Sequence, residues 1–103
     1  MNKINPLELF EKEAPDVQKA YADLINSLVA LKSLDQKTKH LIYIGMKVVT
    51  DDFNAVLYHV PMAKKAGATR DEIKETIVLS LSVTGLKSIS TFLSHALEIY
   101  DNA

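Results

Sequence analysis

Apolar residues recur at helical spacing along most of the chain, and this pattern predicts helices. Between residues 16 and 31 the apolar positions, separated by three or four residues, are Val17, Ala20, Tyr21, Leu24, Leu28 and Leu31, with polar side chains opposite. A second amphipathic pattern runs from Leu86 to about Tyr100. No stretch shows the strict apolar/polar alternation of a half-buried strand. We therefore predict an all-α fold.

Capping residues predict where the helices begin and end. Asn5 before Pro6 is typical of an N-cap followed by proline at the first helical position. Asp35 is expected to cap the helix that contains LIYIGMKVV, and Thr69 with Glu72 predicts a capping box. Further boundaries are expected before Pro15, at residues 50–52, at Gly67 and near Gly85. The result is a compact bundle of five or six helices.

The predicted fourth helix, from Phe53 to Ala66, contains one unfavourable residue. Pro61 has no N–H to donate to the carbonyl of Leu57, and its ring clashes with that carbonyl. We therefore expect a kink or a break just beyond His59. Two other helices, the third and the fifth, are apolar on more sides than a small protomer covers easily. They could form a central pair in the protomer core, but the small size of the chain favours contact between subunits.

Composition narrows the possible functions. With 103 residues the chain has room for a single domain, expected over residues 1–103. The net charge of -1 gives no positive field that would attract nucleic acid or anionic lipid. Neither a signal peptide nor a membrane-spanning run is evident, so we expect a cytoplasmic protein that acts on a small molecule. The chain has no cysteine, which excludes disulfides, thiolate nucleophiles and zinc sites built on sulfur.

Among the polar residues, His59 is the strongest candidate for chemistry because it lies in an apolar helix. Asp52, seven residues earlier, shares the same helix face but is two turns away, too far for a direct bond. A purely structural role remains open for both: His59 as a core or interface histidine, and Asp52 as an N-cap. His40 by itself would be a partly exposed residue beside lysines. No cofactor-binding motif is present, and none is expected.

The order of these features resembles the carboxymuconolactone decarboxylase and alkylhydroperoxidase D superfamily of small helical proteins. The resemblance is carried by EAPDVQKAYADL, by the turn LDQKTK before an apolar helix, by a histidine in the next helix and by AKKAGATRDEIKETIVLSLSVTG. It covers most of the chain and implies an alkylhydroperoxidase D-like bundle that assembles into trimers or hexamers.

Redox members of this superfamily carry C-x-x-C-x-x-x-H, with a proton-relaying glutamate twelve residues before the first cysteine. Placed on His59, this pattern puts the two cysteine positions on Asp52 and Ala55 and the glutamate position on His40. Only the histidine is kept. Because the dithiol is missing, peroxidase activity is not expected.

The resemblance to the decarboxylase branch implies a different chemistry, because that branch acts on a small acidic lactone without a thiol pair. Our hypothesis is a lyase in which His59 transfers a proton and Asp52 or His40 orients or tunes it. The only arginine, Arg70, lies at a helix start, so no arginine is evident to hold a substrate carboxylate.

Two alternatives remain open at this stage. The chain could be a non-catalytic binding or assembly module of the same superfamily. It could also hold a metal ion with His40, Asp52 and His59, since two imidazoles and one carboxylate are the ligand types of a facial triad.

Overall fold

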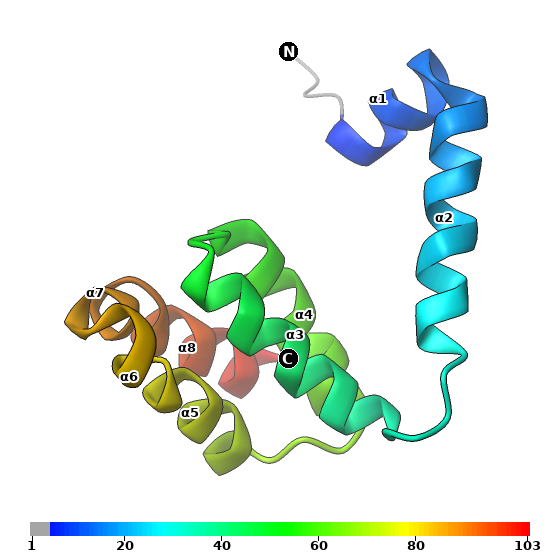
Figure 1. The fold of residues 1–103 in the computed structure, drawn as a ribbon. Coiled ribbons are helices and arrows are strands. Elements are labelled where there is room, and N and C mark those ends of the chain that lie inside the picture. The colour runs from blue at the N-terminus through cyan, green and yellow to red at the C-terminus, as the bar shows by residue number, and fades with distance from the viewer. Residues whose placement is uncertain (1–4) are drawn as a thin grey trace. The chain divides into compact units, whose positions relative to one another are not determined.

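The structure is a computed structural model that describes residues 5–103 (Figure 1). Residues 1–33 and 34–103 belong to two compact units. The described residues of both units form helices connected by short turns and contain no strand, so the prediction of an all-α fold is confirmed. The prediction of a single domain over residues 1–103 stays a prediction.

The first unit consists of α1 (Pro6–Glu13) and α2 (Pro15–Val29). Its predicted N-cap is confirmed, because the side chain of Asn5 accepts a hydrogen bond of 2.8 Å from the backbone N–H of Leu7. The rings of Phe10 and Tyr21 lie 6.3 Å apart and join the two helices. Neither helix contains a buried residue, although α2 carries the amphipathic pattern described above.

The second unit contains the remaining elements. They are α3 (Gln36–Val49), α4 (Phe53–Lys65), α5 (Arg70–Leu79), α6 (Leu81–Thr84), α7 (Leu86–Ser88), the π-helix η1 (Ile89–Leu93) and α8 (Ser94–Asn102). The last three elements follow one another without a gap, so they replace the single helix predicted from Leu86 to Tyr100. Among residues 5–103, no helix combines the length and the apolar character that crossing a bilayer requires.

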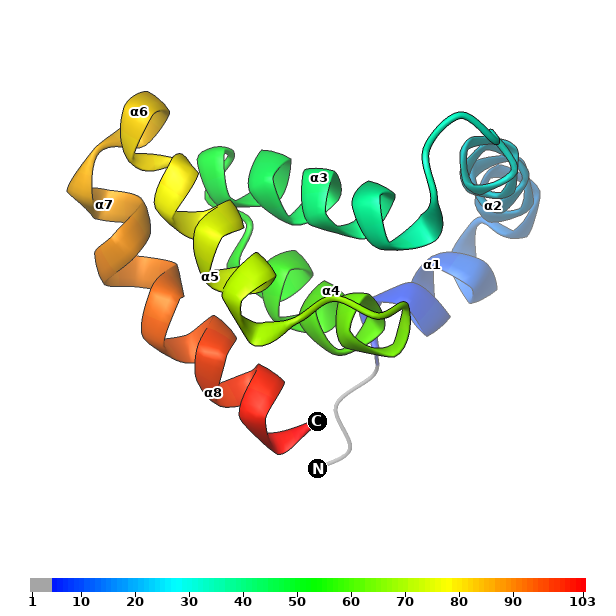
Figure 2. The same cartoon turned by 90° about the horizontal axis from the view of Figure 1, so that it is seen from below.

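The core of the second unit lies where α3, α4, α5 and the stretch from η1 to α8 meet (Figure 2). Its buried apolar residues are Ile44, Val48, Val56, Val60, Ala63, Ala68, Ile73, Ile77, Phe92 and Ala96. Apart from Ala68, which lies between α4 and α5, they recur at intervals of three or four residues along each helical stretch, as one apolar face requires. Helix α3 packs against both α4 and α5, while its apolar residues Ile42 and Met46 stay exposed.

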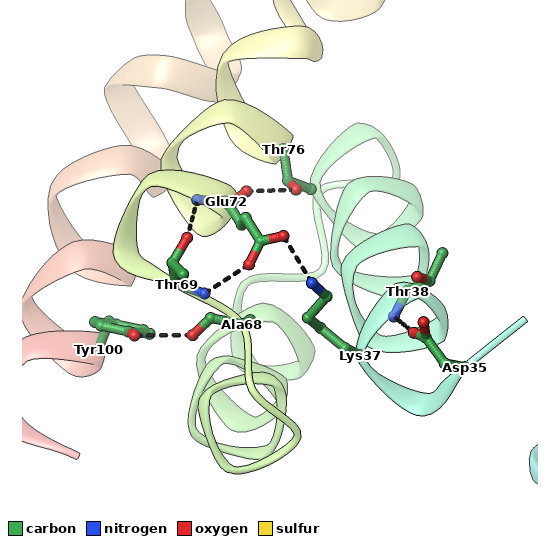
Figure 3. Close-up of polar contacts among 8 residues, drawn as sticks. All are labelled: Asp35, Lys37, Thr38, Ala68, Thr69, Glu72, Thr76 and Tyr100. Atoms are coloured by element: carbon green, nitrogen blue, oxygen red, sulfur yellow. Dashed lines mark hydrogen bonds and ion pairs between the residues drawn. The ribbon is translucent and has the colours of Figure 1, made fainter.

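Several hydrogen bonds and an ion pair meet at the start of α5 (Figure 3). The hydroxyl of Thr69 accepts from the N–H of Glu72 at 3.1 Å, and the Glu72 carboxylate accepts from the N–H of Thr69 at 2.8 Å. Lys37 of α3 reaches the same carboxylate at 3.0 Å. The predicted capping box is therefore confirmed, and it also connects α5 to α3.

Pro61 does not break its helix, so of the kink or break expected just beyond His59 the break is wrong, and the kink stays a prediction. Helix α4 continues from Phe53 to Lys65 with Pro61 inside it. An internal proline costs about 3 kcal/mol. The buried residues Val56, Val60 and Ala63 lie on the same helix, and each fully buried valine contributes about 1.5–3 kcal/mol. Burial of this face is thus large enough to offset the lost hydrogen bond.

Candidate functional site

His59 lies in the middle of α4, next to the face that packs into the core. Its neighbour Val60 is fully buried, whereas Tyr58 on the other side is 66% exposed. The imidazole is itself half-buried. It therefore stands at the boundary between the core and the surface.

Aromatic rings from α3 and α4 surround the imidazole. The ring of Tyr43 is closest, with its centroid 4.1 Å from that of His59. The rings of Tyr58 and His40 follow at 5.6 Å and 5.8 Å. Tyr43 and His40 are three residues apart on α3, so both project from one face of that helix toward α4. Two histidines that are 19 positions apart in the sequence thus share one site.

The hydrogen bonding of His59 is incomplete. Its Nδ1 atom is buried and has no hydrogen-bond partner among residues 5–103. Leaving a buried polar atom unpaired costs about 1–3 kcal/mol, so such an atom calls for an explanation. Burial lowers the pKa of His59 below its usual value of 6.5, and the nearby His40 and Lys47 lower it further. The imidazole is therefore neutral at pH 7 and can accept a proton.

A tight turn between α3 and α4 brings a charged pair to the same site. Asp51 ends α3 in the left-handed conformation with φ of 63°, and the N–H of Asp52 donates to the carbonyl of Lys47 at 2.9 Å. The chain reverses here, so the ammonium of Lys47 lies 3.4 Å from the Asp52 carboxylate. That carboxylate raises the pKa of Lys47 and keeps it cationic. Lys47 also lies 5.4 Å from the centre of the Tyr43 ring.

Asp52 has a structural task at the start of α4. Its Oδ1 accepts from the N–H of Ala55 at 3.2 Å, which makes it the N-cap. Asp52 and Ala55, the positions at which redox relatives are expected to carry cysteines, are joined by this bond. The structure thus brings His40 and His59 together and gives Asp52 other partners. The role of Asp52 or His40 in orienting or tuning His59 stays a prediction.

The metal alternative finds no geometric basis. Within residues 5–103, no group of three histidine, aspartate or glutamate side chains is placed to hold a metal ion. The reason is the position of Asp52, whose carboxylate is bound at the first turn of α4 by the Ala55 N–H and Lys47. The facial triad of His40, Asp52 and His59 considered from the sequence is therefore not formed.

Sequence reasoning missed two residues of the site, Tyr43 and Lys47. Both lie in the apolar segment LIYIGMKVV, where they are the polar-tipped exceptions. They follow His40 by three and seven positions, a spacing that places all three on one helix face. This spacing could have identified Tyr43 and Lys47 as neighbours of His40 from the sequence alone. Arg70, the only arginine, is paired with Asp101 at 2.8 Å.

Comparison with known proteins agrees with the fold and with the resemblance found in the sequence. Of the solved structures, a Burkholderia xenovorans LB400 protein named for carboxymuconolactone decarboxylase is 23% identical with a TM-score of 0.87, covering 98% of this chain and 79% of its own. A carboxymuconolactone decarboxylase family protein from Legionella pneumophila is 28% identical with a TM-score of 0.83, covering 93% and 85%. No curated protein matched the chain.

The family match itself covers residues 15–98 and is described as the carboxymuconolactone decarboxylase family. This range takes in α3, the turn at residues 50–52 and α4, which together carry every residue of the site. The chain belongs to the carboxymuconolactone decarboxylase family.

Proposed function

We propose that the chain is a thiol-independent acid–base lyase that removes CO₂ from a small lactone or carboxylic acid, with His59 as the proton-transfer residue. One observation carries the proposal: the half-buried imidazole of His59 has an unpaired Nδ1 and a lowered pKa. A histidine serving only the core would normally have its buried nitrogens bonded. A neutral imidazole beside an accessible surface is instead suited to take up and return a proton.

The chemistry needs only proton transfer from the protein. Loss of CO₂ breaks a carbon–carbon bond and leaves the electron pair on the remaining carbon, conjugated with a neighbouring carbonyl. A proton must then be delivered to that carbon. The imidazolium form of His59, produced when the imidazole takes a proton from the substrate or from water, can deliver it. Thiol peroxidase activity is not proposed, because the chain has no cysteine.

The test is CO₂ release from a panel of unsaturated lactones and small acids that carry a carboxylate. For any substrate that the wild type turns over, His59→Gln should lower kcat by roughly 10²–10⁴-fold while the protein stays folded. His95→Gln is the matched control, because His95 is exposed on α8 and contacts Phe53 rather than the site. A His59→Gln variant with turnover close to that of the wild type would end the proposal.

A non-catalytic assembly module is the second candidate, and a specific feature favours it. An open apolar groove of about 320 Å³ lies between α3 and α5–α6. Its lining residues are Leu41, Ile42, Gly45, Val49, Thr76, Leu79, Ser80 and Val83. Exposed apolar surface of this kind is typical of subunit contacts. Assembly into cytoplasmic homo-oligomers, as trimers or hexamers, is compatible with either candidate, and native mass spectrometry would measure the subunit number.

A further inference from the structure

Lys47 has an unusual position for a surface lysine. Its side chain is 33% exposed, and it lies between the Asp52 carboxylate and the ring of Tyr43. The contact with Asp52 is 3.4 Å, longer than the roughly 2.7–2.9 Å of a strong charge-assisted hydrogen bond. An ammonium group has three donors, and its two side-chain partners, the Asp52 carboxylate and Tyr43, leave one of them for a ligand. Lys47 can therefore accept a second anionic partner.

Tyr43 connects this cation to the reactive imidazole. Its ring centre is 5.4 Å from the Lys47 ammonium and 4.1 Å from the His59 ring centre. The charge of Lys47 acts on His59 directly, since it is one of the causes of the lowered pKa of that imidazole. A small molecule whose anionic end binds Lys47 would thus have its body against Tyr43 and within reach of His59.

The neighbouring cations of the second unit are engaged elsewhere. Lys37 is paired with Glu72 at 3.0 Å, and Arg70 with Asp101 at 2.8 Å. Lys87 of α7 forms an ion pair with Asp51 at 3.2 Å. Lys47 contacts both Tyr43, whose ring lies against His59, and Asp52 of the turn at residues 50–52.

We propose that Lys47 is the specificity-determining residue of the site and binds a carboxylate of the ligand while the ligand body lies against Tyr43 and His59. This inference rests on the proposed function for the reaction, but binding at Lys47 does not require turnover. An ion pair with the carboxylate that leaves as CO₂ would stabilise the ground state and slow its loss. Lys47 is therefore assigned to a carboxylate that stays on the product.

Benzoate and its neutral isostere benzamide test the inference on the full chain, with the ring signals of His59 followed by NMR. We expect saturable shifts of His59 and roughly ten-fold tighter binding of benzoate than of benzamide to the wild type, as for one charge-assisted hydrogen bond. Lys47→Met should abolish this preference, and Lys47→Arg should keep it. Lys74→Met, which removes an equal charge from an exposed lysine paired with Asp71 on α5, should leave it unchanged.

A second readout separates binding from structural damage. Titrations of the wild type and of Lys47→Met should show a higher pKa of His59 in the variant, because the substitution removes positive field from the imidazole. The other groups that face His59 are His40 and Tyr43 from α3 and Tyr58 from α4, and they are the same in both experiments.

The inference is overturned if Lys47→Met keeps the benzoate preference, or if benzoate leaves the His59 signals of the wild type unmoved. Either result would leave the lyase proposal standing as long as His59→Gln still lowers kcat by roughly 10²–10⁴-fold. Conversely, unchanged turnover in His59→Gln would end the lyase proposal while a lost preference in Lys47→Met would still establish the carboxylate site.

Discussion

Two polar regions of the second unit begin one turn apart on α3 and differ in how their polar groups are satisfied. In the first region, Lys37 forms an ion pair with Glu72 at the start of α5, and Glu72 exchanges two hydrogen bonds with Thr69 (Figure 3). In the second region, His40 lies beside His59 in the middle of α4, and the Nδ1 of His59 has no hydrogen-bond partner among the described residues. The first arrangement holds two helices together. In the second, the unpaired Nδ1 of His59 lowers the stability of the fold and connects no elements, as is expected of a functional site.

The bonded region should respond strongly to the loss of one hydroxyl. Thr69→Ala removes the acceptor for the Glu72 N–H and should lower the free energy of unfolding by about 1 kcal/mol, within a range of about 0.5–2. Urea unfolding would measure the change. Thr69→Ser keeps the hydroxyl and should stay close to the wild type. If serine were as destabilising as alanine, the capping box would not explain the stability of this region.

The unpaired region should respond in the opposite direction. His59→Phe keeps a ring beside Tyr43 but removes the unpaired Nδ1, so the free energy of unfolding should stay constant or rise by up to about 1 kcal/mol. Catalytic turnover should be lost in the same variant. His95→Phe, at an exposed position, controls for the added apolar surface. A clear loss of stability in His59→Phe alone would show that the imidazole has a structural role.

Acid should weaken the two regions in different pH ranges. The N–H of Thr69 and the cation of Lys37 hold the pKa of Glu72 below its usual 4.5, so its contribution is present above 4.5 and is lost as pH falls through the folded-state value. The pKa of His59 is below 6.5, so the unfolded chain binds its proton first and stability declines as pH falls below 6.5.

Unfolding measured from pH 8 down to about pH 2 would separate these contributions. Glu72→Gln should flatten the slope at the acid end, and His59→Phe should flatten the slope just below 6.5. If His59→Phe kept the full slope near 6.5, the histidine responsible would be another one.

Local chemistry explains why the helices could be predicted. Asn5, Asp35 and Thr69 each bond a backbone N–H within three residues, so their capping roles depend on neighbours in sequence. The same holds for the residues around Gly67, whose φ of 104° ends α4 as expected. Pro61 was misjudged because its local cost is offset by burial against other helices, which a local argument does not include.

The site could be predicted only in part, for the same reason. His59 stood out because an ionisable residue in an apolar helix is visible in the sequence. The approach of Tyr43 and Lys47 depends on how α3 folds back onto α4, and that reversal uses a left-handed aspartate, Asp51, at a position where glycine is the usual residue. Once the turn is known, the spacing of His40, Tyr43 and Lys47 on one helix face follows directly.

The titration of His59 in the wild-type protein tests the central claim most directly. Proton NMR of the imidazole signals, assigned with His59→Gln, would follow its protonation through the neutral range. A half-buried imidazole with an unpaired Nδ1, facing the charge of Lys47, should titrate below 6.5 and be neutral at pH 7. A midpoint at or above 6.5 would contradict the account, because the imidazole would then be solvated or paired with an anion.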